Sequence, residues 1–280
     1  MSDLRPISDL RPEAITTVLD RIGLGLGRPY FYLPTVSSTN DLARDLARRG
    51  EPEGTLVVAE AQTAGRGRLG RSWHSPPGTG LWCSLVLRPG VTGAALASLP
   101  IVAGLAAVRA VLSLGGLPLG IKWPNDIVVG DRKVGGLLAE AGQSDDGRGF
   151  VVLGFGLNVA QEAQDFPPEL RETAISLAMA GRPVARSSAL VGWLTALEGL
   201  YRRWLDVGFA AIAPEVSRHL VTLGQRVTVF PAAAGGAPWT GRALALDPSD
   251  GALLVEADDD AAASAPRRVV AGDVTIRAVR

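Results

Sequence analysis

Short runs of aliphatic and β-branched residues, each bounded by turn-forming residues, recur along most of the chain and predict β-strands. The predicted strands occupy residues 55–61, 81–89, 119–124, 126–130, 133–140 and 150–159. Several connections between them are too short for a helix and contain Pro-Asn-Asp, Gly-Asp or Ser-Asp-Asp-Gly, which favour antiparallel hairpins. We therefore expect a mixed, mostly antiparallel sheet.

Apolar residues spaced three and four positions apart predict helices between these strands. The predicted helices span residues 39–50, 94–114 and 187–205. Ser38 or Thr39 can cap the first amides of the first helix. The two longer helices are expected to pack on one face of the sheet. Together these elements predict an α+β domain over residues 30–220.

The two ends of the chain differ from this middle part. Residues 1–29 begin with the repeated sequence SDLRP, and we expect a partly flexible arm with one short helix within residues 13–27. Residues 221–280 contain short alternating strands separated by loops rich in alanine and aspartate. This pattern predicts a small barrel-like β domain.

The composition narrows the class of protein. The chain has 28 Lys+Arg and 28 Asp+Glu, so no net positive charge is available to hold nucleic acid non-specifically. One cysteine, Cys83, excludes an intramolecular disulfide and a thiolate zinc cluster. Gly, Pro or Arg interrupts the apolar runs before about 18 residues accumulate, and the first residues do not resemble a signal peptide. We therefore expect a cytoplasmic protein that does not contact a membrane.

Glycines and arginines alternate in the segment that follows the first predicted strand. Gly65, Gly67 and Gly70 match the dinucleotide-binding pattern GxGxxG. A Rossmann loop, however, follows directly on a buried strand and opens a helix. Here polar residues precede the motif and Ser-Pro-Pro-Gly follows it, so a Rossmann dehydrogenase is disfavoured.

Three arginines, Arg66, Arg68 and Arg71, punctuate this loop. Guanidinium groups match the oxygens of phosphates and carboxylates, and the glycines let the backbone approach a ligand. One interpretation is a loop that closes over an anion; the other is a set of solvated surface arginines. The polar motifs farther along the chain favour the first.

The next polar cluster, KWPND at residues 122–126, lies at the end of a predicted strand. Asn125 could read the edge of a nucleobase, and Asp126 could hold a hydrated magnesium ion or accept a proton. The Pro-Asn-Asp sequence is also sufficient for a tight turn. The strand after it contains Gly135 and Gly136, which indicate either a closely approaching ligand or backbone, or a bulge.

Six sequence blocks resemble those of the biotin–protein ligases, also called biotin–[acetyl-CoA-carboxylase] ligases. They are SSTN (37–40), EAQTAGRGRLGRSW (60–73), GLWCSLVLRP (80–89), IKWPNDI (121–127), KVGGLLAE (133–140) and GFGLNV (154–159). The VAGDV sequence near the end also resembles that family. The resemblance implies a class II synthetase-like catalytic domain followed by an SH3-like domain. The lipoate ligases share the catalytic fold.

The resemblance implies a ligase that works in two steps. The carboxylate of biotin attacks the α-phosphate of ATP to give biotinyl-5′-AMP and pyrophosphate, and a lysine of the biotin carboxyl carrier protein then takes the biotin. ATP enters with Mg²⁺, and no cofactor is permanently bound. Two alternatives are a lipoate or octanoate ligase of the same fold, and a biotin-sensing regulator without catalysis.

The resemblance also assigns roles to individual residues. The positions implied to bind biotin are Ser38, Thr39, Asn40, Gln62, Gly65, Arg66, Gly67, Arg68, Lys133, Gly135 and Gly136. The first four would pair with the ureido ring, and the two strand glycines would let the ring lie on the strand. Lys133 is implied to be the main electrostatic catalyst, assisted by Arg66 and Arg68.

A second set of residues is implied to bind ATP and the adenylate. It comprises Arg68, Arg71, Trp73, Lys122, Asn125, Asp126 and Asn158. Trp73 would cover the adenine, and Asp126 could contact Mg²⁺, although no cluster of side chains marks a metal site.

The amino end departs from the bifunctional members of that family, which carry a winged-helix DNA-binding domain. Only about thirty-five residues precede Ser37, which is too few for such a domain. We therefore expect a monofunctional ligase that does not bind nucleic acid. Its edge strands could pair into a weak homodimer.

Overall fold

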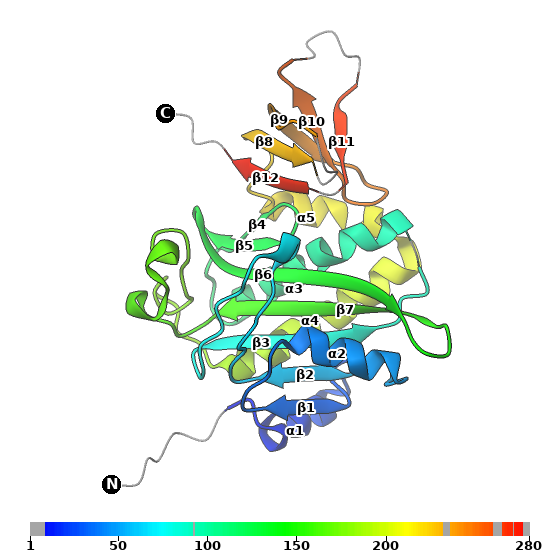
Figure 1. Cartoon of the computed structure of the whole chain (residues 1–280), viewed down its shortest axis with the longest axis vertical. Coiled ribbons are helices and arrows are strands. Elements are labelled where there is room, and N and C mark those ends of the chain that lie inside the picture. Colours follow the sequence, from blue (N-terminus) through cyan, green and yellow to red (C-terminus); the bar gives the residue numbers. More distant parts are fainter. Residues whose placement is uncertain (1–8, 92, 232–235, 260–264, 271, 277–280) are drawn as a thin grey trace.

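The computed structural model describes residues 9–91, 93–231, 236–259, 265–270 and 272–276. Within them, a seven-stranded sheet carries the helices, and a five-stranded sheet lies near the C-terminus (Figure 1). The strands of the large sheet are β1 (Tyr30–Leu33), β2 (Leu56–Ala59), β3 (Gly80–Leu87), β4 (Gly120–Lys122), β5 (Asp126–Val129), β6 (Arg132–Gln143) and β7 (Gly149–Asn158).

The order of these strands is β1-β2-β3-β7-β6-β5-β4. Only β1 and β2 pair in parallel, and all other neighbours pair antiparallel. The chain from β4 to β7 runs through three successive hairpins, as the short turn sequences predicted. The mixed, mostly antiparallel sheet is therefore confirmed.

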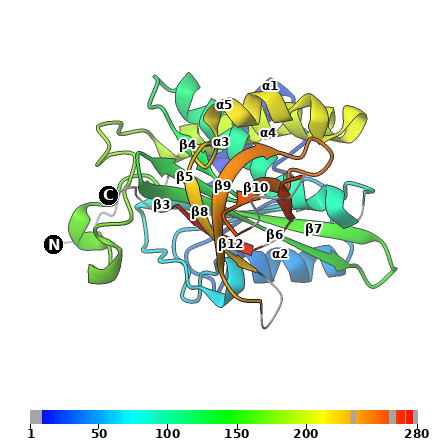
Figure 2. The same ribbon diagram turned by 90° about the horizontal axis from the view of Figure 1, so that it is seen from above.

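Helices cover both faces of the large sheet. They are α1 (Pro12–Ile22), α2 (Thr39–Arg48), α3 (Leu99–Ser113), α4 (Arg186–Val207) and α5 (Ala213–His219), with short 3-10 turns η1 (Arg68–Gly70), η2 (Gly93–Ser98), η3 (Ala163–Asp165), η4 (Pro168–Leu170) and η5 (Phe209–Ala211). Viewed along the edge of the sheet, α2 lies on one side, and α3, α4 and α5 lie on the other (Figure 2). The α2 side holds the candidate site.

Side chains of the strands alternate between two cores, because successive residues of a strand point to opposite faces. On β3, Cys83 and Leu85 belong to the large core with α3 and α4. Val86 belongs to a smaller core under α2 that also contains Ala43 and Val152. The polar side chains of the α2 side are therefore anchored on a packed layer.

The stretch Gly93–Ser113 has the length and hydropathy of a membrane-spanning helix, although the sequence led us to expect none. Its most apolar window is 67% buried in the protein. It packs against α4, which explains why it is apolar on all sides.

The C-terminal domain is a five-stranded antiparallel sheet with the order β11-β10-β9-β8-β12. Its strands are β8 (Arg226–Pro231), β9 (Trp239–Leu246), β10 (Leu253–Ala257), β11 (Arg267–Val269) and β12 (Gly272–Ile276). This arrangement confirms the predicted SH3-like domain. The domain packs against the end of β4, where the amide of Val221 donates to the carbonyl of Ile121 at 2.9 Å.

The amino-terminal segment is more ordered than the sequence suggested. The predicted helix is α1, and it ends at Gly23 in the left-handed conformation. The first SDLRP repeat lies outside the described residues. In the second, Leu10 is fully buried and Asp9 pairs with Arg186 at 2.9 Å. The described part of this repeat is therefore held against the rest of the protein, and the flexibility of the arm stays a prediction.

Candidate active site

A cavity of about 430 Å³ opens beside the N-terminal end of α2, between the arginine loop and the β4–β5 turn. It brings together nearly all the residues singled out in the sequence: Ser38, Thr39, Asn40, Gln62, Arg66, Gly67, Arg68, Arg71, Trp73, Lys122, Asn125, Asp126, Lys133, Gly136 and Asn158. These residues come from widely separated segments. Their convergence supports a binding site.

Two glycines assigned to biotin, Gly65 and Gly135, do not line the cavity. A Cβ atom on Gly65 would lie 2.5 Å from the carbonyl oxygen of Trp73, so this glycine lets the base of the loop close. A Cβ atom on Gly135 would lie 3.0 Å from the carbonyl oxygen of Gly156 and 3.2 Å from Leu157. In this structure the backbone of both glycines packs against other parts of the protein, and their contact with biotin stays a prediction.

Neutral polar groups form the end of the cavity at the start of α2. The amide and the hydroxyl of Thr39 donate to Gln62 Oε1 at 2.8 and 3.1 Å. The Ser38 side chain makes no capping hydrogen bond, so the predicted cap is wrong and Gln62 takes its place. Because Ser38 and Thr39 are almost fully buried, this end suits a ligand with its own donors and acceptors.

Asn40 lies deep in the same end of the cavity. Its Oδ1 is 2.5 Å from the Ser84 hydroxyl, and its Nδ2 donates to Glu140 Oε2 at 2.7 Å. A Cβ atom on Gly154 would collide with Asn40 Oδ1. The glycine on β7 therefore permits this asparagine to lie against the sheet.

Cationic groups form the opposite end of the cavity. Arg68 Nη1 donates to Asn125 Oδ1 at 3.2 Å, which joins the arginine loop to the β4–β5 turn. Burial lowers the pKa of the Arg68 guanidinium below its ordinary value, and the charge of Asp126 opposes this shift. A guanidinium remains charged in proteins, so a partly buried one gains stability from a bound anion.

Lys133 lines the cavity and is held from several sides. Its ammonium pairs with Asp126 Oδ1 at 2.6 Å and lies 5.1 Å from the ring centre of Trp73. Its amide donates to the carbonyl of Thr173 at 2.7 Å, and its carbonyl accepts from the amide of Ile175 at 2.9 Å. The lysine is thus attached to a rigid strand and aimed by a carboxylate and an aromatic ring.

Trp73 lies on paired glycines of β6 and β7. Gly136 and Gly156 are neighbours in the strand register, and Cβ atoms on them would lie 3.3 and 2.7 Å from the indole. The indole also contacts Trp82 edge to face, with ring centres 6.4 Å apart. We expected the biotin ring on the strand at Gly136. The structure has the indole there.

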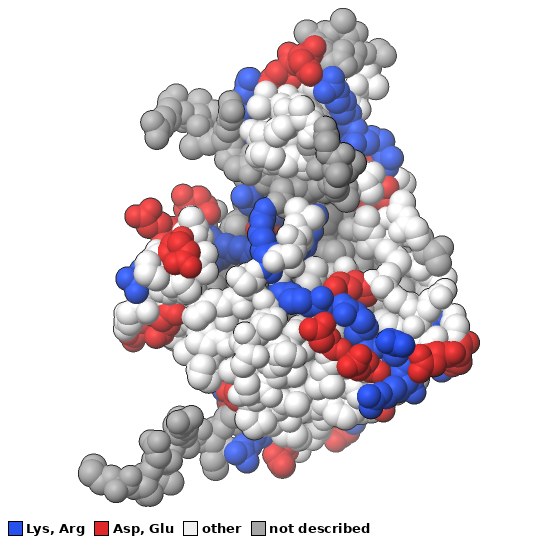
Figure 3. Space-filling view, viewed as in Figure 1, with Lys and Arg blue, Asp and Glu red and all other residues white. Residues whose placement is uncertain are grey.

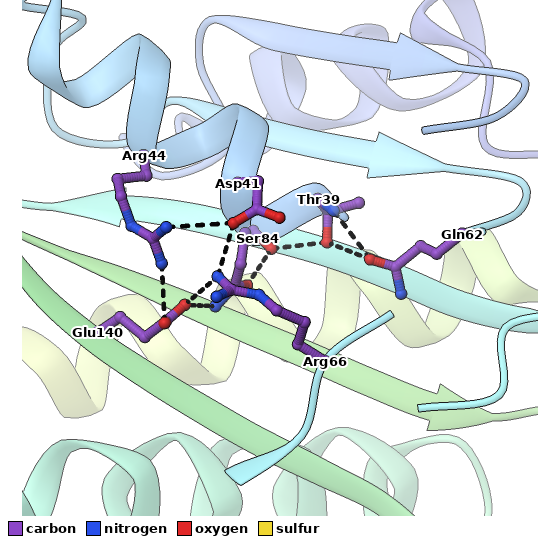
Figure 4. A network of polar contacts seen from close by, with 8 residues as sticks. Thr39, Asp41, Arg44, Gln62, Arg66, Ser84 and Glu140 are labelled. Carbon is purple, nitrogen blue, oxygen red and sulfur yellow. Dashed lines mark hydrogen bonds and ion pairs between the residues drawn. The ribbon is translucent and has the colours of Figure 1, made fainter. Parts of the chain in front are cut away.

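The side chain of Arg66 joins a network of charges at the rim of the cavity (Figure 4). Its Nη2 lies 2.8 Å from Asp41 Oδ1 and 2.8 Å from Glu140 Oε2. Arg44 pairs with the same two carboxylates at 3.1 and 2.8 Å. The charge of Arg66 is therefore largely balanced, and its pairs secure the base of the loop.

Asn158 is buried at the wall of the cavity. Its Nδ2 donates to the carbonyl of Ile175 at 3.1 Å, and its Oδ1 accepts from Gln161 at 3.1 Å. Both hydrogen bonds hold the segment after β7 against the sheet. In this structure the side chain supports the wall, although its sequence block suggested contact with the adenylate.

The sequence did not point to several residues of the site. They are Asp41, Arg44, Ser84 and Glu140 of the polar network, and Phe166, Leu170, Thr173 and Ala174 of the wall formed around η3 and η4. Asp41 directly follows the SSTN block and Glu140 ends the KVGGLLAE block. The positions of these motifs could therefore have indicated both residues. The residues of the wall belong to no sequence motif that would have indicated them.

The charges on this face are mixed. In the space-filling view, Lys and Arg atoms gather near the hollow below the C-terminal domain, and basic and acidic side chains alternate in the band beneath it (Figure 3). Among the described residues, no group of three or more His, Cys, Asp or Glu could hold a metal ion. The carboxylates that line the cavity are Asp126 and Asp131.

Known proteins are similar to this chain in sequence and in fold. The model of the biotin/lipoate A/B protein ligase family matches residues 32–158. The bifunctional ligase/repressor BirA of Bacillus subtilis (strain 168) is 37% identical over 235 residues, which cover 84% of this chain and 71% of that protein. The biotin–[acetyl-CoA-carboxylase] ligase of Mycobacterium tuberculosis is 32% identical over 228 residues, which cover 79% of this chain and 82% of that protein. The chain belongs to the biotin protein ligase family.

Solved structures of biotin protein ligases agree with this assignment. The ligase of Aquifex aeolicus in complex with biotin and ATP superposes with a TM-score of 0.73 at 28% identity. The match covers 88% of this chain and 97% of that chain. The family resemblance, the fold class and the assignment as a ligase are therefore confirmed. The roles of single residues are not tested by these comparisons and stay predictions.

Proposed function

We propose that this ligase activates biotin with ATP as biotinyl-5′-AMP and then transfers it to a lysine of a biotin carboxyl carrier protein. The observation that carries this proposal is that neutral polar groups and cationic groups line one and the same cavity. Neutral hydroxyl and amide groups lie at the start of α2, whereas Arg68 of the arginine loop and Lys133 of β6 contact Asn125 and Asp126 at the β4–β5 turn. The neutral groups can exchange hydrogen bonds with the ureido ring of biotin. The cations can bind its carboxylate.

In the first step, a carboxylate oxygen of biotin attacks the α-phosphorus of ATP. The new phosphorus–oxygen bond forms as the bond to the pyrophosphate oxygen breaks, and pyrophosphate leaves with the electron pair. Two anions must meet, so the site has to neutralise charge and align the groups. We assign this role to Lys133 and Arg68, and the ion pair between Lys133 and Asp126 supports the assignment because it holds the ammonium in position.

ATP is expected to enter with Mg²⁺, which supplies charge neutralisation for the phosphate oxygens. Magnesium usually binds one or two carboxylates together with substrate phosphates. The cavity offers ligands of this kind, because the carboxylates of Asp126 and Asp131 line it. We propose these two residues as the protein contacts of the ion.

In the second step, the amine of a carrier lysine attacks the carbonyl carbon of the adenylate. The amide bond forms, AMP leaves with the electrons of the acyl–phosphate bond, and the amine gives up a proton. The ligase needs no nucleophile of its own for this exchange. Cys83 is the one cysteine of the chain, and its burial in β3 does not favour a role as a nucleophile.

The direct test incubates the protein with ATP, Mg²⁺, biotin and the biotin-accepting domain of an acetyl-CoA carboxylase. We expect biotin on one lysine of the acceptor, detected by mass spectrometry, and no product when that lysine is replaced by arginine. Lipoate and octanoate serve as competing acids, since the hydrogen-bonding end of the cavity should reject both. An unlabelled acceptor, or preferential transfer of lipoate or octanoate, would refute the proposal.

A further inference from the structure

We infer that Glu140 is a positioning residue that couples the biotin-ring end of the cavity to the arginine loop. The inference rests on the proposed function, because it concerns the same cavity. Glu140 does not line the cavity itself, and it lies on β6 beneath the loop and beside α2 (Figure 4). It therefore acts through the residues that it holds.

A single oxygen of Glu140 accepts two hydrogen bonds from the cavity lining. Glu140 Oε2 is 2.7 Å from Asn40 Nδ2 and 2.8 Å from Arg66 Nη2. Asn40 belongs to the end with neutral polar groups, whereas Arg66 begins the arginine loop. If either side chain moves, the carboxylate that holds the other must adjust.

The rest of the network keeps this carboxylate in place. Glu140 Oε1 pairs with Arg44 Nη2 at 2.8 Å, so both oxygens have partners. The side chain of Glu140 is 24% exposed, and water therefore screens it only in part. Deleting the carboxylate would leave Asn40 Nδ2 without its acceptor. It would also leave Asp41 as the only carboxylate of the network that pairs with Arg44 and Arg66.

Asp41 offers a comparison, because it holds only one of the two partners. It pairs with Arg66 at 2.8 Å and with Arg44 at 3.1 Å, and it makes no hydrogen bond to Asn40. Its removal should loosen the loop without disturbing Asn40. The two carboxylates can therefore be separated by experiment.

The geometry of Arg66 suggests what the loop does once it is held. Arg66 lines the cavity, and its Nε is buried without a hydrogen-bond partner among the described residues. Because Nη2 is taken by the two carboxylates, Nε is left for an acceptor on a bound ligand. Glu140 would thus fix the position of a guanidinium that keeps one donor free for a ligand.

The test measures two quantities in each variant: KM for biotin in adenylate formation, and the rate at which bound biotinyl-AMP escapes from the enzyme. Glu140→Ala should raise both by about 10-fold, the low end for losing charge-assisted hydrogen bonds that are partly solvated. Asp41→Asn should raise the escape rate and leave KM for biotin within about 2-fold. The kcat of the first step should change less than either quantity.

Two further variants keep the result interpretable. Glu140→Gln retains a neutral oxygen for Asn40, so KM should recover while the escape rate stays high; this outcome also covers the case in which Glu140→Ala fails to fold. Asp145→Asn removes an exposed carboxylate outside the network and should change neither quantity.

Specific outcomes would overturn the inference. Normal values of both quantities in Glu140→Ala would show that the carboxylate positions nothing, and a change in only one of them would contradict the coupling. An equal rise of KM in Asp41→Asn would contradict the division between the two acids. If the unaltered protein forms no biotinyl-AMP, the proposed function fails instead, so the two failures are distinguishable.

Discussion

Lys133 illustrates how single residues of the site depend on their neighbours. Its backbone is bonded on both sides to the segment around Thr173, and its ammonium is directed by Asp126 and Trp73. Such fixation matters because a charge stabilises a transition state most when it needs no rearrangement. The side chain contributes little to the core, since it is 36% exposed.

Replacing Lys133 with alanine should therefore separate activity from stability. We expect the rate of adenylate formation to fall by about 100-fold or more, because a preorganised charge is lost from the reacting phosphate. The free energy of unfolding should change by less than about 1 kcal/mol. Pyrophosphate exchange and urea unfolding provide the two measurements. Unchanged turnover would remove Lys133 from the mechanism.

The packing of Trp73 on glycine gives a second prediction at this scale. A Cβ atom on Gly156 would lie 2.7 Å from the indole, so Gly156→Ala should displace Trp73. We expect an altered tryptophan emission spectrum and a KM for ATP raised by about 10-fold, comparable to the loss of an aromatic stacking contact. The control is Gly149→Ala, because open space surrounds that glycine on the same strand. Equal behaviour of the two variants would contradict this account of the glycines.

At the scale of elements, the C-terminal domain supports the turn that carries the KWPND sequence. The amide of Trp123 donates to the Thr222 hydroxyl at 2.9 Å, and its indole donates to the carbonyl of Gly251 at 3.0 Å. Trp123 thereby fixes the β4–β5 turn on which Asn125 and Asp126 lie. The small domain is thus part of the framework of the active site.

Thr222→Val tests this connection, since it removes the acceptor of a buried amide while preserving the shape of the side chain. Thr222 is fully buried, so we expect the free energy of unfolding to fall by about 1–3 kcal/mol and KM for ATP to rise. Thr195→Val on the exposed side of α4 is the matched control and should cost less than about 0.5 kcal/mol. If KM for ATP stays constant while stability falls, the turn does not depend on this contact.

The elements also show how far sequence patterns extend. The hairpins from β4 to β7 follow from turn residues next to one another in the chain, so local chemistry predicts them. The orientation of Gly135 does not follow, because the register between β5 and β6 shifts at Ile127 and Val128. The ion pairs of Arg66 with Asp41 and Glu140 could not be predicted either, because these residues lie in three distant segments that meet only once the sheet has formed.

At the scale of the whole molecule, the site lies on the α2 side of the large sheet, beside the turn that the C-terminal domain supports through Trp123. The α2 side of the sheet supplies the neutral end of the cavity, and the turn supported by the C-terminal domain supplies part of the cationic end. Because elements far apart in the chain supply the two parts of the cavity, the motifs are spread over more than a hundred residues. The monofunctional form, the absence of nucleic-acid binding and the weak homodimer stay predictions.

The behaviour of Cys83 reports on the integrity of this arrangement. Burial raises the pKa of its thiol, and only 1% of the residue is exposed, so little thiolate is accessible to reagents. We expect the native protein to resist iodoacetamide at pH 8 and to be alkylated once guanidinium unfolds it. Intact-mass spectrometry reads the outcome. Rapid alkylation of the folded protein would show that the central strand is accessible.

The most direct test of the account isolates the intermediate in the absence of any acceptor protein. The enzyme is mixed with biotin, Mg²⁺ and ATP labelled in the α-phosphate, separated from free nucleotide by rapid gel filtration, and quenched for chromatography. We predict close to one biotinyl-AMP per active site in the protein fraction, and none with Lys133→Ala on the same timescale. Labelled ATP that emerges unreacted, or an adenylate found only in free solution, would contradict a cavity that joins the two substrates and retains their product.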